Sequence, residues 1–318
     1  MSEPTDPIAE RIFAGAFLLI DKPRGPSSHQ VTAWARDLLG VERAGHAGTL
    51  DPNVSGLLWV GVGPALKLLP LVLDFPKRYV GVVTFHAAVA ARDLAKAIEE
   101  FTGPVYQTPP VRSAVRRERR VRTIHRLHRV ESDGNRVVLD VVADSGTYIR
   151  TLAVDLGEAL GVGAHLEELR RIATGPFDES QSVPLTALAD AVARRAAGDP
   201  APLLALLHPI AEVWREFPTI VLKDSAAAAV AHGAGLARGG ILALPRSFAA
   251  GAHVALVDRA GDLVATGVAR HASTEVGGVA HGWVVDATRV FVDPARFPAR
   301  WQQPRRAPDA TTDPPALR

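Results

Sequence analysis

A short glycine-rich segment carries the side chain best placed to do chemistry in this sequence. It runs from Gly45 to Gly56 and holds one carboxylate, Asp51, with His46 five residues upstream. Pro52 disfavours the α region for the residue before it, so Asp51 cannot lie inside a helix. A carboxylate held in such a loop can act as a nucleophile. The alternative is an ordinary surface turn, in which Asp, Gly and Pro are all common.

The segment Gly-x-x-Gly-Thr-Leu-Asp-Pro resembles the catalytic motif of the TruB/dyskerin family of RNA pseudouridine synthases. Other segments resemble further motifs of that family and follow in the family's order over residues 15 to 175. They are Asp21-Lys22-Pro23, Lys77-Arg78-Tyr79, Ser145 to Leu152, and Leu169-Arg170-Arg171. The agreement of several motifs in order favours the enzyme over the surface turn.

The resemblance implies a catalytic set of three residues, with Asp51 as nucleophile, Arg150 as its partner and Tyr79 packed against the target base. Making pseudouridine breaks an N-glycosidic bond, turns the base and joins C5 to the sugar, without net redox change. A carboxylate can attack and later leave, an arginine can fix its direction with a forked contact, and a tyrosine can stack on uracil and reach a proton. Without the family, Arg150 could equally be a helix cap or a surface ion pair, and Tyr79 a core residue.

The same resemblance implies a second set of residues that contact the substrate or the RNA. His46 would fill the gap left by a flipped base, Lys22 would support the floor of the site, and Leu169 would belong to its apolar wall. The remaining members are Arg117, Arg120 and Lys223. The first two lie in an arginine-rich run, for which a polyanion partner is at least as good an explanation as a solvated face.

Several segments resemble the archaeal and eukaryotic dyskerin branch of the family. Among them, residues 223–226 and 232–234 resemble the start of a PUA domain, an RNA-binding fold, although Arg238-Gly239-Gly240 stands where Pro-Gly is usual. This branch implies a catalytic subunit of the H/ACA guide-RNA complex with three small protein partners, acting on ribosomal RNA. It is also compatible with guide-free modification of the T-loop uridine of tRNA. Two alternatives remain: an inactive RNA-binding scaffold of the same family, and an aspartate-nucleophile hydrolase.

Composition narrows the possible functions. The chain has 318 residues, of which 47% are hydrophobic and 22% charged, with a formal net charge of +2, as in ordinary globular proteins. It has no cysteine, which excludes disulfides, thiolate nucleophiles and cysteine-ligated metals. The histidines show no metal-ligand spacing, so we expect neither metal nor cofactor. With no signal pattern and no apolar run near the ~20 residues of a membrane span, we expect a cytoplasmic protein without membrane contact.

The candidate loops need strands and helices to hold them. Apolar runs and period-two patterns predict strands at 16–20, 57–62 and 79–85, and a hairpin of 121–130 with 136–143. Helical spacing predicts helices at 64–73, 94–101, 146–160 and 185–196, and one after 28 that Ser27 or Ser28 caps. Gly198-Asp199-Pro200 indicates the start of a linker.

Together with the family resemblance, these features predict an α+β protein with two domains. The first, residues 12–210, would be the pseudouridine synthase catalytic domain, with a mixed, mainly antiparallel central sheet flanked by helices. From residue 217 to 295, short apolar runs alternate with glycine, which is typical of a small all-β module and implies a β-barrel PUA domain. The composition of residues 304–318 predicts a disordered tail.

Overall fold

The computed structural model describes residues 6–108 and 118–297. Contacts divide the chain into two compact units, Met1–Val213 and Trp214–Arg318. Arg117 and the predicted tail, 304–318, lie outside the described residues.

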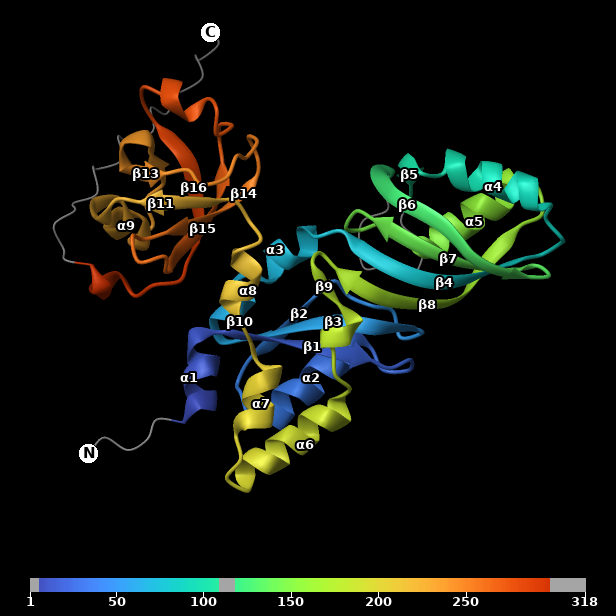
Figure 1. Cartoon of the computed structure of the whole chain (residues 1–318), viewed down its shortest axis with the longest axis horizontal. Coiled ribbons are helices and arrows are strands. Elements are labelled where there is room, and N and C mark those ends of the chain that lie inside the picture. The colour runs from blue at the N-terminus through green and yellow to red at the C-terminus, as the bar shows by residue number, and fades with distance from the viewer. Residues whose placement is uncertain (1–5, 109–117, 298–318) are drawn as a thin grey trace, which may run out of the picture. The chain divides into compact units, whose positions relative to one another are not determined.

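A large sheet forms the centre of the first unit (Figure 1). In the described part of the chain its strands follow the order β10-β1-β3-β8-β4-β7-β6-β5, with β2 added beside β3 and β9 beside β8. Only β3 and β8 pair in parallel among these strands. The strands are β1 (Ala16–Lys22), β2 (Ala44–Ala47), β3 (Val54–Val62), β4 (Lys77–Phe85), β5 (Gly103–Gln107), β6 (Arg120–Asp133), β7 (Arg136–Ala143), β8 (Ala164–Thr174), β9 (Phe177–Asp178) and β10 (His208–Pro209). The prediction of a mixed, mainly antiparallel sheet is confirmed.

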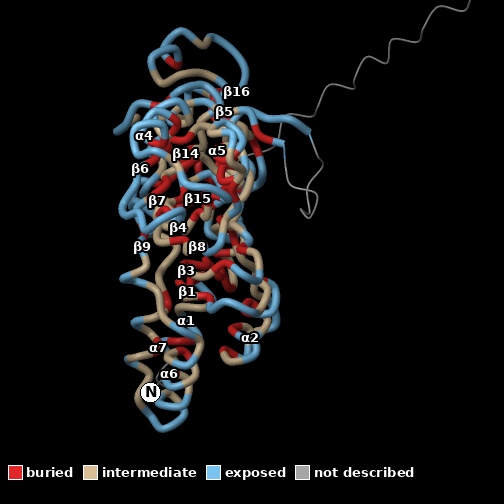
Figure 2. The backbone as a smooth tube through the Cα atoms, turned by 90° about the vertical axis from the view of Figure 1, so that its right-hand side faces the viewer, coloured by how far each residue is buried: buried red, intermediate tan, exposed pale blue. Residues whose placement is uncertain are grey.

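Helices cover the sheet in two groups, each with its own apolar core (Figure 1). One core joins β1 and β3 to the first group, α1 (Pro7–Ala14), α2 (Ser28–Leu39), α6 (Leu185–Ala196) and α7 (Ala201–Leu206). The other joins β4, β6 and β7 to α4 (Ala91–Glu100) and α5 (Ile149–Ala159). Nearly every residue of β1 and β3 is buried, with Asp21 and Ser55 intermediate (Figure 2), as the apolar runs at 16–20 and 57–62 predict. The candidate loops therefore start from rigid strands.

The helix predictions agree with the structure at most positions. Ser27 is the residue that caps α2, because its hydroxyl accepts from the backbone N–H of Gln30. The single helix predicted at 64–73 is instead a 3-10 turn, Gly63–Lys67, followed by α3 (Leu69–Asp74). Pro70 lacks a backbone N–H and therefore fits the first turn of a new helix better than the interior of a longer one.

The predicted linker at residues 198–200 is wrong. The chain continues into α7 and then β10, which pairs with β1 through Ala16 and Pro209. Gly198 and Pro200 end one helix and begin the next, which gives them the same local signature as a linker.

The second unit contains a six-stranded, nearly closed and barrel-like sheet, as predicted, with the strand order β12-β16-β15-β14-β11-β13. Its elements are α8 (Ile210–Trp214, shared with the end of the first unit), β11 (Thr219–Leu222), α9 (Asp224–Ala231), β12 (Leu236–Ala237), β13 (Ile241–Ala243), β14 (His253–Val257), β15 (Leu263–Ala269) and β16 (Trp283–Val290). The description as all-β missed α9, whose alanines favour a helix and whose Ala227 and Val230 lie in the core.

Candidate active site

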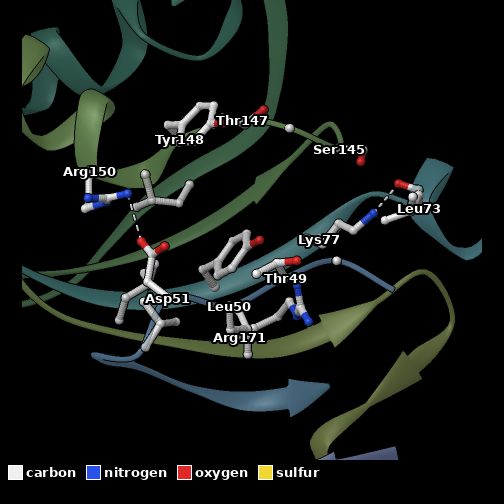
Figure 3. A pocket seen from close by; sticks show the side chains of 16 residues that line it. Thr49, Leu50, Asp51, Leu73, Lys77, Ser145, Thr147, Tyr148, Arg150 and Arg171 are labelled. Carbon is white, nitrogen blue, oxygen red and sulfur yellow. Dashed lines mark hydrogen bonds and ion pairs between the residues drawn. The ribbon is translucent and has the colours of Figure 1, made fainter. Parts of the chain in front are cut away.

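The loop that carries Asp51 forms one wall of a pocket of about 320 Å³ in the first unit (Figure 3). Asp51 lies between β2 and β3, and Arg150 is the second residue of α5. Their side chains meet across the pocket, with 2.9 Å between Arg150 Nη2 and Asp51 Oδ2. Both side chains remain partly accessible, since the exposed fraction is 39% for Arg150 and 47% for Asp51. A bound molecule can therefore reach the carboxylate while the arginine holds it.

The turn before Arg150 is fixed by a buried amide. Gln107, at the end of β5, is 3% exposed. Its Nε2 donates to the carbonyl of Tyr148 at 3.1 Å, and its Oε1 accepts from the N–H of Tyr148 at 2.9 Å. Gly146 has φ +77°, a conformation that L side chains rarely adopt. The start of α5, and with it Arg150, therefore has a defined position.

The loop of Asp51 is held from below by Ser28 and Lys22. The Ser28 hydroxyl, 1% exposed, donates to the carbonyl of Leu50 and accepts from its N–H, both at 2.8 Å. Lys22 Nζ donates to the carbonyls of Pro26 at 2.9 Å and Pro52 at 3.3 Å. The backbone on both sides of Asp51 is thus tied to the first strand and helix.

Lys22, which the sequence analysis placed among the substrate or RNA contacts, lies inside the protein. Its side chain is fully buried, and its ammonium group is used by backbone carbonyls of this loop and of the turn after β1. Burial lowers the pKa of Lys22, and the charge of Asp51 partly opposes that shift. Lys22 therefore supports the catalytic loop through these hydrogen bonds, and its contact with the substrate or the RNA stays a prediction.

We expect Ser28→Ala to lower the free energy of unfolding by about 1–3 kcal/mol, because both backbone groups of Leu50 would remain buried without a partner. Turnover should also fall, since the loop of Asp51 would no longer be fixed. Ser27→Ala is the matched control, because it removes a capping hydroxyl of the same helix that does not touch the loop. Denaturant unfolding and turnover of both variants test this, and equal turnover losses would contradict it.

Tyr79 lies on β4 and lines the same pocket, with Leu169 on the neighbouring strand β8. Arg171, also on β8, is the neighbour of Tyr79 across the two strands, and the Tyr79 hydroxyl interacts with its guanidinium group. Leu169 and Val54 add apolar surface. A flat ring held by a strand, beside aliphatic side chains, suits a planar base.

Lys77 is a pocket residue that the sequence analysis did not assign a role. It is 4% exposed and donates to the carbonyls of Leu73, Phe75 and Val72 around the end of α3. Burial, followed by the charge of Arg171, lowers its pKa to about 8. The sequence feature that could have pointed to Lys77 is its position two residues before Tyr79, in the same motif. Because its ammonium group donates to carbonyls at the end of α3, Lys77 ties the start of β4 to that helix.

His46 lines a different hollow from the pocket of Asp51, together with His29 and Thr32. Its Nδ1 lies 3.0 Å from Thr32 Oγ1 and its Nε2 3.2 Å from Thr49 Oγ1. The rings of His29 and His46 are 4.7 Å apart. Burial lowers the pKa of His46, with smaller effects from His29 and Arg171. His46 is thus connected to the catalytic loop through Thr49, and its role in base flipping stays a prediction.

Neither Arg120 nor Lys223 is among the residues that line the pocket. Arg120 begins β6, is exposed and pairs with Glu118 at 3.8 Å. Lys223 belongs to the second unit, where it donates to the carbonyl of Gly239 at 2.8 Å and lines an open hollow with Arg238. The RNA contacts of Arg120 and Lys223 therefore stay predictions.

Within the described residues, no group of three or more His, Cys, Asp or Glu side chains is arranged to hold a metal ion. Over the same residues, no helix is both long and apolar enough to cross a membrane.

The sequence matches three family models in succession. They are TruB family pseudouridylate synthase (N terminal domain) at 36–149, tRNA pseudouridylate synthase B C-terminal domain at 150–213, and PUA domain at 218–291. Relatives named "probable tRNA pseudouridine synthase B" include one from Methanothermobacter thermautotrophicus, 42% identical over 89% of this chain and 88% of its own. The one from Pyrobaculum arsenaticum is 43% identical over 96% and 92%.

Solved structures give the same result. The chain matches a crystal structure of a Cbf5-Nop10-Gar1 complex with a TM-score of 0.85 and 38% identity. The match covers 91% of this chain and 88% of that one. A structure of an H/ACA RNP bound to a substrate RNA containing 2′-deoxyuridine matches with a TM-score of 0.82 and 36% identity, covering 93% and 90%. The chain therefore belongs to the TruB family of pseudouridylate synthases, which are isomerases, and it carries a C-terminal PUA domain.

Proposed function

We propose that this chain isomerises uridine to pseudouridine in RNA with Asp51 as the nucleophile. The observation that carries the proposal is the 2.9 Å pair of Asp51 and Arg150 in a pocket that Tyr79 also lines. Arg150 balances the charge of the carboxylate and fixes its direction, because a guanidinium group donates along defined lines. The target base must leave its stack to enter the pocket.

The chemistry assigned to each residue follows from the isomerisation itself. Asp51 attacks the ring or the sugar and is released again when C1′ is joined to C5, so the enzyme ends unchanged. Tyr79 stacks on the uracil and takes part in moving the proton that must leave C5. Leu169 covers the apolar side of the base. The atoms of substrate and product are the same, so no co-reactant is consumed.

The names of the relatives support a proposal for the RNA substrate. The curated relatives are named for tRNA. The structural neighbours are a Cbf5-Nop10-Gar1 complex, an archaeal box H/ACA sRNP Nop10-Cbf5 complex and an H/ACA RNP bound to a substrate RNA. We propose that the chain modifies the T-loop uridine of tRNA, or ribosomal RNA as the catalytic subunit of an H/ACA guide-RNA complex, or both. Small proteins of the Nop10 and Gar1 kind would be its partners, and the PUA domain would bind RNA.

Mapping of pseudouridine tests this function. Full-length chain is incubated with tRNA and ribosomal RNA transcripts, with and without an H/ACA guide RNA and the small partner proteins. Pseudouridine in the T-loop without guide supports guide-free action, and modification only with the guide supports the complex. If RNA binds tightly but no pseudouridine forms under any condition, the chain is an inactive scaffold and the proposal is overturned.

A further inference from the structure

Arg171 occupies the centre of the sheet directly behind the candidate active site. It lies on β8 between β3 and β4, opposite Gly56 on one side and Tyr79 on the other. Its residue is 1% exposed, although it lines the same pocket as Asp51 (Figure 3). Fully buried arginines are rare unless they are paired. The contacts of this guanidinium group therefore need an explanation.

The guanidinium group is only partly satisfied by hydrogen bonds. Nε donates to the carbonyl of Leu57 at 2.7 Å. The group also interacts with Tyr79, which is its neighbour across β4 and β8 and lines the same pocket. Nη2 has no acceptor among the residues that the structure describes. The catalytic loop packs against it, since a Cβ on Gly48 would lie 2.9 Å from Nη1. Arg171 thus touches both the tyrosine and the loop of the nucleophile.

The charge of Arg171 has no carboxylate partner among the described residues. Burial lowers its pKa, and Tyr79 is the group that favours its charged form, by charge and by hydrogen bond. The same charge lowers the pKa of Lys77, which lines this pocket, and of His46, which lines the neighbouring hollow. Burying a cation without a charged partner is energetically costly. The fold therefore maintains a positive charge at the side of Tyr79.

We propose that Arg171 is a positioning residue for Tyr79, which holds its hydroxyl in place and stabilises negative charge on its oxygen during proton transfer. This inference rests on the proposed function. A purely structural role would be to tie β8 to β3 through Leu57, but that requires only Nε and leaves the contact with Tyr79 unused. Preorganised charge beside an atom that becomes anionic lowers the barrier of that step.

The proton transfers balance in two steps. When the C1′–N1 bond breaks, its electron pair stays on N1, and the Tyr79 hydroxyl gives its proton to N1. The resulting phenolate lies beside Arg171. After C1′ is joined to C5, the phenolate takes the proton from C5, and the electrons of that C–H bond return to the ring. Net transfer is one proton from C5 to N1, and Tyr79 is restored.

The test compares Arg171→Lys and Arg171→Gln in the full-length chain, on an RNA in which the wild type forms pseudouridine. We expect kcat to fall by about 10²-fold or more in Arg171→Gln, as for loss of acid–base assistance, and by less in Arg171→Lys, with KM nearly unchanged. RNA deuterated at C5 should show a larger isotope effect in both variants, because removal of that proton becomes slower. Arg136→Lys is the control, since Arg136 pairs with Glu167 at the opposite end of β4 from Tyr79.

A double variant separates the roles. In a Tyr79→Phe background, Arg171→Gln should cost little further activity, because the two residues act as a unit. Independent, multiplying losses or an unchanged isotope effect would overturn the proposal while leaving the proposed function intact. A wild-type chain that makes no pseudouridine would instead refute the function.

If the Arg171 variants do not melt cooperatively, 4-aminophenylalanine at position 79 provides the test. This side chain keeps the ring and a polar tip but cannot form the anion. Activity as low as that of Tyr79→Phe supports the proposal, whereas activity near the wild type overturns it.

Discussion

Asp51→Asn should abolish pseudouridine formation, with kcat reduced by at least ~10⁴-fold, as is typical when a nucleophile is removed. The amide has nearly the same shape as the carboxylate but is a poor nucleophile. RNA affinity should stay within a few-fold of the wild type, because the side chain lies in a pocket and not on a charged surface. Single-turnover assays and RNA-binding titrations measure the two effects separately.

The loss in Asp51→Asn should not come from unfolding. The pair with Arg150 is half exposed, and such pairs contribute only about 0–1 kcal/mol to stability. Asp37→Asn is a matched control, because Asp37 is also exposed and pairs with an arginine, Arg36, at 2.7 Å. It should melt and react as the wild type does. Turnover near the wild-type rate in Asp51→Asn would exclude Asp51 as the nucleophile.

The sequence predicted the parts of the fold that local patterns control. The apolar runs of β1 and β3, the hairpin of β6 and β7, and a serine cap on α2 follow from periodicity and turn chemistry within a few neighbouring residues. The sequence left the cap open between Ser27 and Ser28, and the structure selects Ser27. The segment after Gly198 was misread, because a helix end followed by a helix start has the same residues as a linker. Only the pairing of β10 with β1, nearly two hundred residues earlier in the chain, distinguishes them.

The site was predicted from family motifs more than from physics, and its buried charges show why. Lys22 and Arg171 are fully buried, whereas charged residues are mostly exposed, so their sequence positions alone suggest a surface. Their partners are mostly backbone carbonyls, and for Arg171 that carbonyl belongs to Leu57, which is distant in the chain. Hydrogen bonds to backbone leave no trace in the identity of the partner residue. The supporting half of the site therefore emerges only from the folded chain.

Arg150→Ala should reduce turnover by about 10²-fold or more, because a misplacement of the reacting group by 1 Å can have that cost. The carboxylate of Asp51 would lose the contact that fixes its direction, since Arg150 is its ion-pair partner at 2.9 Å. Stability should change little, for the same reason as in Asp51→Asn. KM for RNA should rise less than kcat falls, because Arg150 acts on the nucleophile inside the pocket.

Arg150→Lys distinguishes charge from geometry at this position. An ammonium group keeps the positive charge but loses the planar fork that can donate in two directions, so we expect poor rescue, closer to Arg150→Ala than to the wild type. Arg270→Ala is the matched control, because Arg270 pairs with Asp286 at 2.8 Å with similar exposure in the second unit. It should leave kcat unchanged. Full activity in Arg150→Lys would show that Arg150 supplies only charge, and full activity in Arg150→Ala would remove it from the catalytic set.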